Sequence, residues 1–372
     1  MGGRRRYGVS SDLSRRSAMT PPRPHAGAAL VAALAVAACG GRSAPSTPAP
    51  SAAPPAAEVA VTLAYAGGLL SALADDSMEG RGTATPGGER AARLIADQMR
   101  AYGLVPAGDS GYFQYVPLAV TVAPDSTRRL TLADGASPSG GTVRGINVVG
   151  IVRGTDPKLR EESVLIDAHY DHLGIGPPVA GDSIYNGADD DASGVVAVLT
   201  AARALAAGPP PRRTVVFLAT TGEELGLLGT RWYIEHPAMP LERTVANLEI
   251  EMIGRPDSLA GGRGKGWLTG FARSTMGSLL AAAGIPVVAD ARPDQHFFER
   301  SDNVAFALRG IPAHTLSSYN MHTDYHTPAD DLSRVDLAHL ARLAEAAARA
   351  ARLLADGDPP VWNPGGRPLP PH

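Results

Sequence analysis

The sequence contains a single cysteine, and this scarcity excludes two structural solutions at once. No disulfide can form within the chain, and a zinc centre built mainly from cysteine thiolates is excluded. An excess of charge of one sign is also lacking, since 34 Lys and Arg stand against 37 Asp and Glu for a net charge of −3. Nucleic-acid-binding proteins usually present a basic face. We therefore expect no nucleic-acid partner.

The N-terminal region lacks a hydrophobic run long enough to span a bilayer. An arginine-rich start is followed by an apolar run over residues 26–38 and then by Cys39, which is the three-part form of a secretory signal. The sequence VAAC at 36–39 resembles a bacterial lipobox, in which the cysteine is acylated and becomes the mature N-terminus. We predict a signal peptide with lipobox over 1–39. The alternative is a plain secretory signal cut near Ala38.

Lipid on Cys39 would tether the exported protein to the cell envelope without spanning the membrane, on the periplasmic side of the outer membrane if the cell is Gram-negative. Residues 40–57 contain Pro, Ala and Ser with almost no bulky apolar side chain, which predicts a disordered linker. A folded domain is predicted over 58–355. Residues 356–372 are predicted to form a Pro/Gly-rich C-terminal tail.

Short apolar segments alternate with helical patterns within 58–355. The expected strands are 148–152, 164–169, 215–220, 246–252 and 311–316, and the expected helices are 59–74, 86–102, 192–206, 226–236, 273–283 and 335–354. The polar segment 114–145 is predicted to add a small strand excursion or a short inserted element. Fully apolar strands alternating with helices predict an α/β three-layer sandwich with a central mixed, mostly parallel β-sheet flanked by helices.

Acidic and histidine residues gather in five segments at the ends of these expected strands. The segments are AHYDHLG (168–174), GADDDASG (187–194), GEELGLLG (222–229), EMIGR (251–255) and YHTPADD (325–331). Singly, each fits a structural histidine, a helix cap or a solvated face. Glu249 and Glu251 differ, because two carboxylates on one face of an apolar strand are costly to bury unless they are neutralised. Five such segments together predict a metal centre at one edge of the sheet.

The types of side chain restrict the metal. Histidines with carboxylates and no thiolate suit zinc, cobalt or manganese at a hydrolytic centre. Two histidines and three carboxylates are too many for one four-coordinate ion with an open position. They predict two ions that share a bridging carboxylate and that together polarise a carbonyl and activate a water held between them.

The five segments, in this order, resemble the di-zinc aminopeptidases of metallopeptidase family twenty-eight, which includes aminopeptidase Y and glutamate carboxypeptidase II, over about residues 60–350. The stretch MEGRGTATPGG resembles the start of bacterial members. The resemblance implies a zinc-exopeptidase fold for 58–355 and two Zn²⁺ per chain that act on peptide substrates. It implies that the metal ligands are His169, Asp190, Glu224, Glu251 and His326, with Asp190 bridging.

The same resemblance implies the catalytic groups. Glu223 matches the general base, Asp171 orients His169, and Tyr325 is a candidate to stabilise the oxyanion. Asp189 and Asp191 stay open as alternatives to Asp190, as does Glu249 to Glu251. No ligand position was found for His172, His296, His314 or His322.

The resemblance favours an aminopeptidase that releases N-terminal residues. The alternatives are a single-zinc enzyme similar to glutaminyl cyclases, a carboxypeptidase and a binding ectodomain without metal. The polar segment 292–303 is predicted to line the pocket that sets specificity.

Overall fold

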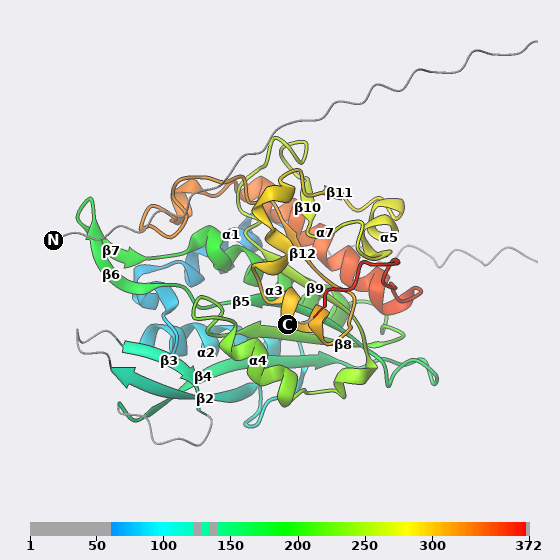
Figure 1. Cartoon of the computed structure of the whole chain (residues 1–372), viewed down its shortest axis with the longest axis horizontal. Helices are drawn as coiled ribbons and strands as arrows, with labels where there is room; N and C mark the ends of the chain where they lie inside the picture. Colours follow the sequence, from blue (N-terminus) through cyan, green and yellow to red (C-terminus); the bar gives the residue numbers. More distant parts are fainter. Residues whose placement is uncertain (1–60, 123–127, 134–139, 370–372) are drawn as a thin grey trace, which may run out of the picture. The chain divides into compact units, whose positions relative to one another are not determined.

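A computed structural model describes residues 61–122, 128–133 and 140–369 (Figure 1). The predicted signal peptide, lipobox and linker lie outside these residues. Within the described ranges, no helix combines the length and the hydropathy that crossing a bilayer requires.

The described residues form one large sheet and a separate hairpin. The helices are α1 (Leu63–Leu73), α2 (Pro86–Ala101), α3 (Gly194–Ala207), α4 (Leu228–Glu235), α5 (Met276–Ala282), α6 (Asn303–Leu308) and α7 (Leu337–Asp356). The strands are β1 (Val105–Pro106), β2 (Phe113–Val122), β3 (Arg128–Leu132), β4 (Thr142–Val152), β5 (Ser163–His169), β6 (Gly174–Val179), β7 (Asp182–Tyr185), β8 (Thr214–Thr220), β9 (Thr244–Glu251), β10 (Gly266–Leu268), β11 (Val287–Ala289) and β12 (Ala313–Ser317).

The large sheet has the strand order β11-β10-β12-β9-β5-β8-β4-β2-β3, and β1 pairs with β4. Its centre is parallel, because β12, β9, β5 and β8 all run in the same direction. Antiparallel pairs extend it on both sides, through β10 next to β12 and through β4, β2 and β3 next to β8. Strands β6 and β7 pair only with each other.

Alternation along the central strands creates two apolar layers. Val164 and Ile166 of β5 pack into the core that contains α1, α2, α3 and α7, whereas Leu165 faces the smaller core with Tyr233 of α4 and Phe306 of α6. Successive side chains of a strand point to opposite faces, so strands apolar at every position must be covered on both. Figure 1 shows helices in front of and behind the sheet. The predicted α/β three-layer sandwich is confirmed.

The strand pattern differs from the prediction in the segment 114–145. Instead of a small excursion, it contributes β2, β3 and the start of β4 to the large sheet. Along the first part of β2, buried residues alternate with half-buried ones. Such alternation is typical of an antiparallel strand with one less covered face. The half-buried residues of β2 are Phe113, Tyr115 and Pro117, so the polar residues that made the segment look turn-rich belong to β3 and to the sequence around it.

Candidate metal centre

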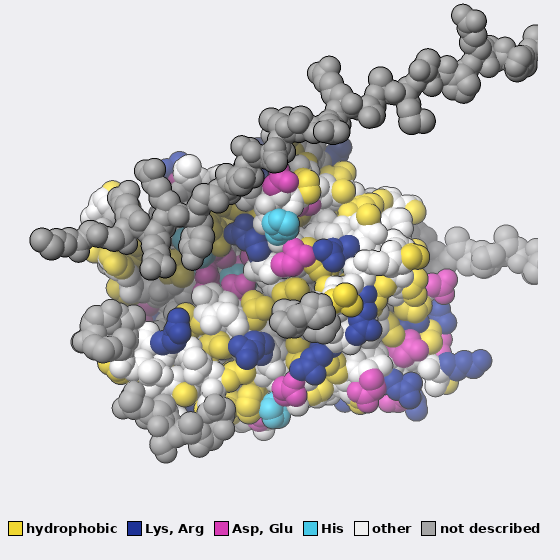
Figure 2. All heavy atoms as spheres, in the orientation of Figure 1, with side chains coloured by type: hydrophobic (Ala, Val, Ile, Leu, Met, Phe, Trp, Pro, Cys, Tyr) yellow, Lys and Arg dark blue, Asp and Glu magenta, His cyan; other side chains and the backbone are white. Residues whose placement is uncertain are grey.

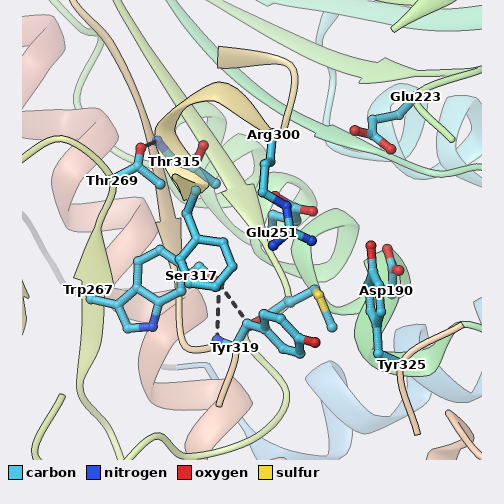
Figure 3. A pocket seen from close by; sticks show the side chains of 12 residues that line it. Asp190, Glu223, Glu251, Trp267, Thr269, Arg300, Thr315, Ser317, Tyr319 and Tyr325 are labelled. Carbon is cyan, nitrogen blue, oxygen red and sulfur yellow. Dashed lines mark hydrogen bonds between the residues drawn. The ribbon is translucent and has the colours of Figure 1, made fainter. Parts of the chain in front are cut away.

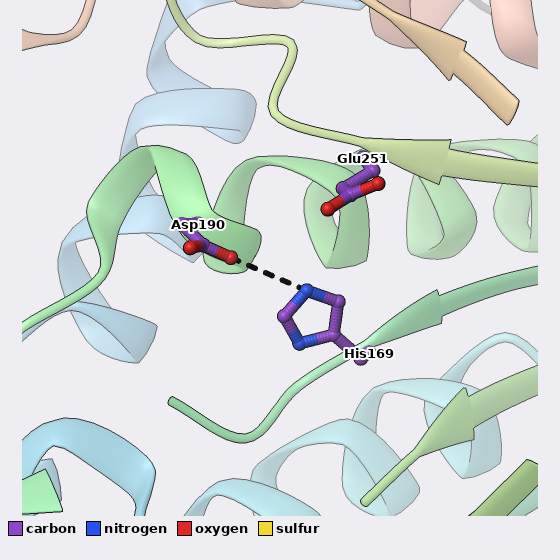
Figure 4. A group of neighbouring side chains, drawn as sticks. All are labelled: His169, Asp190 and Glu251. Carbon is purple, nitrogen blue, oxygen red and sulfur yellow. Dashed lines mark ion pairs between the residues drawn. The ribbon is translucent and has the colours of Figure 1, made fainter. Parts of the chain in front are cut away.

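The candidate site lies where the central parallel strands end. His169 is the last residue of β5, Glu251 is the last residue of β9, and Glu223 and Glu224 follow β8. Because these strands are parallel neighbours, their carboxyl ends meet at one edge. Asp190 reaches this edge from η2 (Ala188–Ser193), the short irregular turn before α3. Figure 4 shows His169, Asp190 and Glu251 facing one another.

His169, Asp190 and Glu251 form a first group, in which one possible ligand atom from each lies within 4.8 Å of the others. His169 is fully buried, and its Nδ1 lies 3.0 Å from the backbone oxygen of Asp171. A carbonyl oxygen only accepts, so a neutral ring carries its proton on Nδ1 and directs the lone pair of Nε2 into the site. That nitrogen lies 3.2 Å from Asp190 Oδ1 and has no hydrogen-bond partner.

A second group lies on the other side of Asp190. His326 Nε2, from the loop after β12, lies 3.2 Å from Asp190 Oδ2 and 3.2 Å from Glu224 Oε2. His172 Nδ1 lies 2.8 Å from Glu224 Oε1 and 3.7 Å from Asp190 Oδ2. The two oxygens of Asp190 therefore face two different groups of histidine and carboxylate.

His172 is a member of this cluster that the sequence analysis did not identify. It is buried, its Nε2 has no hydrogen-bond partner, and it can form a metal-binding group with Asp190 and Glu224. A buried ring nitrogen without a partner is costly unless a ligand satisfies it. The sequence offered one indication of this role. His172 follows His169 by three residues, so it lies just beyond the end of β5, at the same edge of the sheet.

The concentration of carboxylates raises several pKa values at this edge. Burial raises the pKa of Glu223 well above its usual value, with His169 acting in the opposite direction. Burial and then the charge of Glu249 raise the pKa of Glu251 to about 8. Burial lowers the pKa of His326, but hydrogen bonds to Asp190 and Glu224 outweigh it and raise the value to about 10. Together with the buried nitrogens that lack partners, this crowding fits divalent cations bound between the side chains.

Glu249 is buried on the same strand as Glu251, but it is held elsewhere. Its carboxylate accepts hydrogen bonds from the Asp302 and Asn303 backbone nitrogens, both at 3.0 Å, and from Thr315 Oγ1 at 2.7 Å. Ser301 Oγ donates as well. Both carboxylate oxygens of Glu249 are therefore occupied by hydrogen bonds. The carboxylate from β9 that lies with His169 and Asp190 is that of Glu251.

Asp189 and Asp191 also point away from the histidines of the two groups. Asp189 Oδ1 accepts from Gly254 N at 2.6 Å, and Asp191 Oδ1 accepts from Met252 N at 2.9 Å. Both carboxylates thereby fasten η2 to the segment after β9. Asp330 closes the loop from the other side, because its carboxylate accepts from the backbone nitrogens of Asp189 and Asp190.

Arg81 holds the same loop from the N-terminal part of the chain. It is fully buried, and its guanidinium donates to the backbone oxygens of Tyr170 at 2.7 Å, Leu73 at 3.0 Å and Gly187 at 2.8 Å. It also donates to the Asn186 oxygen. One side chain thus ties the segment after β5 to the residues that precede Asp190. The sequence analysis included Arg81 only within the entry segment MEGRG and gave it no role.

The predicted catalytic residues lie next to the two groups. Asp171 Oδ1 accepts from the backbone nitrogen of Glu223 at 3.2 Å, Oδ2 accepts from Thr83 Oγ1 at 2.8 Å, and Oδ1 lies 3.8 Å from His169 Nδ1. Asp171 therefore connects His169 with Glu223. The Tyr325 ring stacks on His326 with centroids 3.8 Å apart.

A small pocket that is partly open to solvent adjoins the first group (Figure 3). It is lined by Asp190, Glu223, Glu251, Met252, Trp267, Thr269, Phe297, Arg300, Thr315, Ser317, Tyr319 and Tyr325. Phe297 and Arg300 come from the segment 292–303, and the role of this segment in specificity stays a prediction. On the face shown in Figure 2, acidic and basic side chains are interspersed, and Asp, Glu and His side chains are visible in a hollow.

The three-layer sandwich is similar to the fold of solved zinc-dependent exopeptidases. BSAP, a zinc aminopeptidase from Bacillus subtilis, aligns over 81% of this chain and 97% of its own, with a TM-score of 0.58 and 16% identity. The glutaminyl cyclase of Porphyromonas gingivalis aligns over 78% of this chain and 98% of its own, with a TM-score of 0.54 and 17% identity.

Residues 147–351, more than half of the chain, match the model of peptidase family M28, and the chain belongs to that family. A vacuolar membrane protease of Aspergillus clavatus is 29% identical over 255 residues, which cover 64% of this chain. The chain spans about a quarter of the length of this relative. The family recognised in the sequence is therefore confirmed.

Proposed function

We propose that this chain is a di-zinc aminopeptidase that hydrolyses peptide bonds and releases N-terminal residues. One observation carries the proposal: the two oxygens of Asp190 lie 3.2 Å from the Nε2 atoms of two different histidines, His169 and His326. A carboxylate placed between two histidine–carboxylate groups suits a pair of metal ions that it bridges. Membership of a peptidase family supports peptide-bond hydrolysis as the reaction.

Each of the two groups would supply the ligands of one metal ion. His169, Glu251 and Asp190 would hold one zinc ion, and Glu224, His326 and Asp190 would hold the other. His172 faces the second group and offers it an additional nitrogen. Histidine nitrogen and carboxylate oxygen without thiolate are the donors of hydrolytic zinc sites. When bound, the two ions would polarise the scissile carbonyl and lower the pKa of a water molecule.

Glu223 is the proposed general base. It lines the pocket together with Asp190 and Glu251, so its carboxylate adjoins the position of a scissile bond (Figure 3). Its oxygen would take a proton from the attacking water and later deliver that proton to the leaving amine. A raised pKa suits both transfers, because the carboxyl then holds the proton more readily between the two steps.

Asp171 and Tyr325 have supporting roles in this proposal. Asp171 accepts from the Glu223 backbone nitrogen and lies behind His169, so it would fix the base relative to the first metal ion. Tyr325 lines the pocket beside Asp190, where its hydroxyl would donate to the oxyanion. Burial and the charge of Asp190 raise the pKa of Tyr325, so the hydroxyl keeps its proton.

Metal analysis tests the proposal directly. Purified chain should contain two zinc ions, lose hydrolysis of aminoacyl reporter substrates after chelation, and recover it when zinc is returned. Elemental analysis and activity should rise together during the titration, because Asp190 belongs to both groups. Peptidase activity that survives complete metal removal would refute the metal mechanism.

The metal count also separates the alternatives. One zinc ion per chain, with cyclisation of N-terminal glutamine in place of hydrolysis, would favour the cyclase-like reading. A folded chain that binds no zinc would favour a binding ectodomain. A carboxypeptidase would hydrolyse N-blocked peptides that an aminopeptidase leaves intact.

Lipid attachment at Cys39 is the second part of the proposal, and it rests on the sequence alone. Cys39→Ser should move the full-length protein from the membrane fraction to the soluble fraction, because the serine hydroxyl cannot form the lipobox thioether. Fractionation followed by immunoblotting measures the shift, with Ser43→Ala as a control next to the same site. Unchanged partitioning of Cys39→Ser would leave a plain secretory signal as the better interpretation.

A further inference from the structure

The pocket beside the first metal group has a continuous aromatic wall. Trp267 of β10 stacks on Phe297 with centroids 5.0 Å apart, Phe297 meets Tyr319 edge to face at 5.9 Å, and Tyr319 lies 5.4 Å from Tyr325. These four residues also form an apolar cluster with Met252. Such a wall packs against the non-polar part of one bound residue, next to the carboxylates of the site.

Arg300 is the one basic side chain among the residues that line this pocket in the described part of the chain. Its guanidinium carbon lies 5.1 Å from the centre of the Phe297 ring, so the aromatic wall supports the cation. Figure 3 shows Arg300 between the carboxylates on one side and Trp267 and Thr269 on the other. The pocket therefore combines an apolar wall with one positive charge.

The Arg300 guanidinium makes no hydrogen bond or ion pair to any residue within 61–122, 128–133 and 140–369. Neighbouring arginines differ in this respect. Arg292 donates to Asp257 at 2.6 Å, and Arg273 pairs at 2.9 Å with Glu299, the residue next to Arg300. These two arginines are thus neutralised within the fold, whereas the Arg300 guanidinium has no such partner among the described residues.

Glu223 and Glu251 also line the pocket, but neither forms an ion pair with Arg300 among the contacts of the described residues. Under the proposed function, Glu251 binds metal and Glu223 transfers a proton. The positive charge of Arg300 then has no counterpart in the site until a substrate brings one. A planar guanidinium matches a carboxylate through two parallel hydrogen bonds.

We propose that Arg300 binds a free carboxylate of the substrate and that the enzyme prefers peptides that carry such a carboxylate next to the scissile bond. The inference rests on the proposed function, because it places the scissile bond at the adjoining metal groups. The carboxylate has two possible sources: an Asp or Glu side chain at the N-terminal residue, or the α-carboxylate at the C-terminus of a short peptide.

Matched reporter substrates test the side-chain source. Glutamyl and glutaminyl reporters differ only in carboxylate against amide, and the wild type should cleave the glutamyl substrate with about 10–100-fold higher kcat/KM, as a charged hydrogen-bond pair typically gives. Arg300→Met keeps much of the apolar stem and should reduce the ratio to about one, whereas Arg300→Lys should retain part of it. Arg243→Met, at an exposed arginine outside the pocket, should leave the ratio unchanged.

A second pair of substrates tests the α-carboxylate. If the wild type cleaves a dipeptide with free amino and carboxyl termini better than its C-terminal amide, and Arg300→Met removes that preference, the α-carboxylate is the source. If Arg300→Met leaves carboxylate selectivity at wild-type level in every pair for which the wild type shows it, the inference is overturned while the peptidase assignment stands. A wild type with no preference in either pair overturns it too.

Binding separates failure of this inference from failure of the proposed function. If the zinc-loaded wild type hydrolyses none of these substrates, the proposed function fails, and calorimetry then compares binding of free L-glutamate with that of L-glutamine. Tighter binding of glutamate that is lost in Arg300→Met supports the carboxylate site by itself. Both amino acids carry an α-carboxylate, so a loss of affinity for both in Arg300→Met supports the α-carboxylate source, and affinities that the substitution leaves unchanged refute the carboxylate site.

Discussion

Glu223→Gln should reduce kcat by about 10²–10⁴-fold while two zinc ions remain bound, since a general base typically contributes a factor of that size. Glutamine has almost the same shape as glutamate but cannot accept the proton of the attacking water. Glu223 is outside both metal-binding groups, and its backbone nitrogen donates to Asp171, so the substitution preserves that hydrogen bond. Steady-state kinetics measure the loss of kcat, and elemental analysis measures the number of bound zinc ions.

A matched control makes this result specific. Glu161→Gln removes the same charge at an exposed position in the turn before β5 and should change neither kcat nor the zinc content. If Glu223→Gln keeps wild-type turnover, another group performs the proton transfer. If it loses zinc, Glu223 is a ligand, and the assignment of Glu224 has to be revised.

Asp190→Asn should have an effect at least as large, because it weakens both metal sites in one step. Asparagine keeps the size of aspartate but removes the charge that faces His169 on one side and His326 on the other. We expect fewer than two zinc ions per chain and a loss of kcat/KM on the order of 10³-fold or more, as is typical when a whole catalytic unit is disabled. Zinc titration followed by activity should restore only part of the loss.

The control for this variant is Asp182→Asn in the exposed hairpin β6–β7. Asp182 accepts a hydrogen bond from the Ile184 backbone nitrogen through a side-chain oxygen that asparagine also has. Zinc content and kinetics should therefore match the wild type. Retention of two tightly bound ions by a folded Asp190→Asn, verified by circular dichroism, would contradict the bridging role of Asp190.

The sequence predicted the parts of the fold in which a pattern repeats over several residues. The strands that became β5, β8, β9 and β12 are apolar at nearly every position, which only burial on both faces explains. The edge of the sheet was harder to predict from the sequence, because β3 is short and mostly polar and the segment between β2 and β4 contains many turn-forming residues. Strand β10 has only three residues, too few for a periodic pattern to form.

The sequence predicted those residues of the site that lie in a short segment with a recognisable order of acidic residues and histidines. Asp190 and Glu251 could be proposed because each stands in a recognisable series of residues, Asp190 before Ser193 and Glu251 before MIGR, although Asp189, Asp191 and Glu249 competed with them. The structure separates these pairs by hydrogen bonds that come from distant residues, such as Thr315 on β12 for Glu249. No local pattern contains that information.

His172 and Arg300 show two other limits of prediction from the sequence. His172 was assigned no ligand position, because its direction depends on how the chain leaves β5. Arg300 gains its significance from the absence of an ion-pair partner in the described residues, and only three-dimensional contacts decide which of several neighbouring arginines are neutralised.

The position of Arg81 has a consequence for the extent of the functional unit. The match to the peptidase family begins at residue 147, whereas the guanidinium that holds Tyr170 and Gly187 comes from residue 81. A fragment cut at the borders of the family match would contain every proposed metal ligand and still leave those backbone oxygens without their donor. We therefore expect a fragment that keeps the proposed site intact to start before Arg81, because the segment that contains Arg81 holds the loop that carries Asp190.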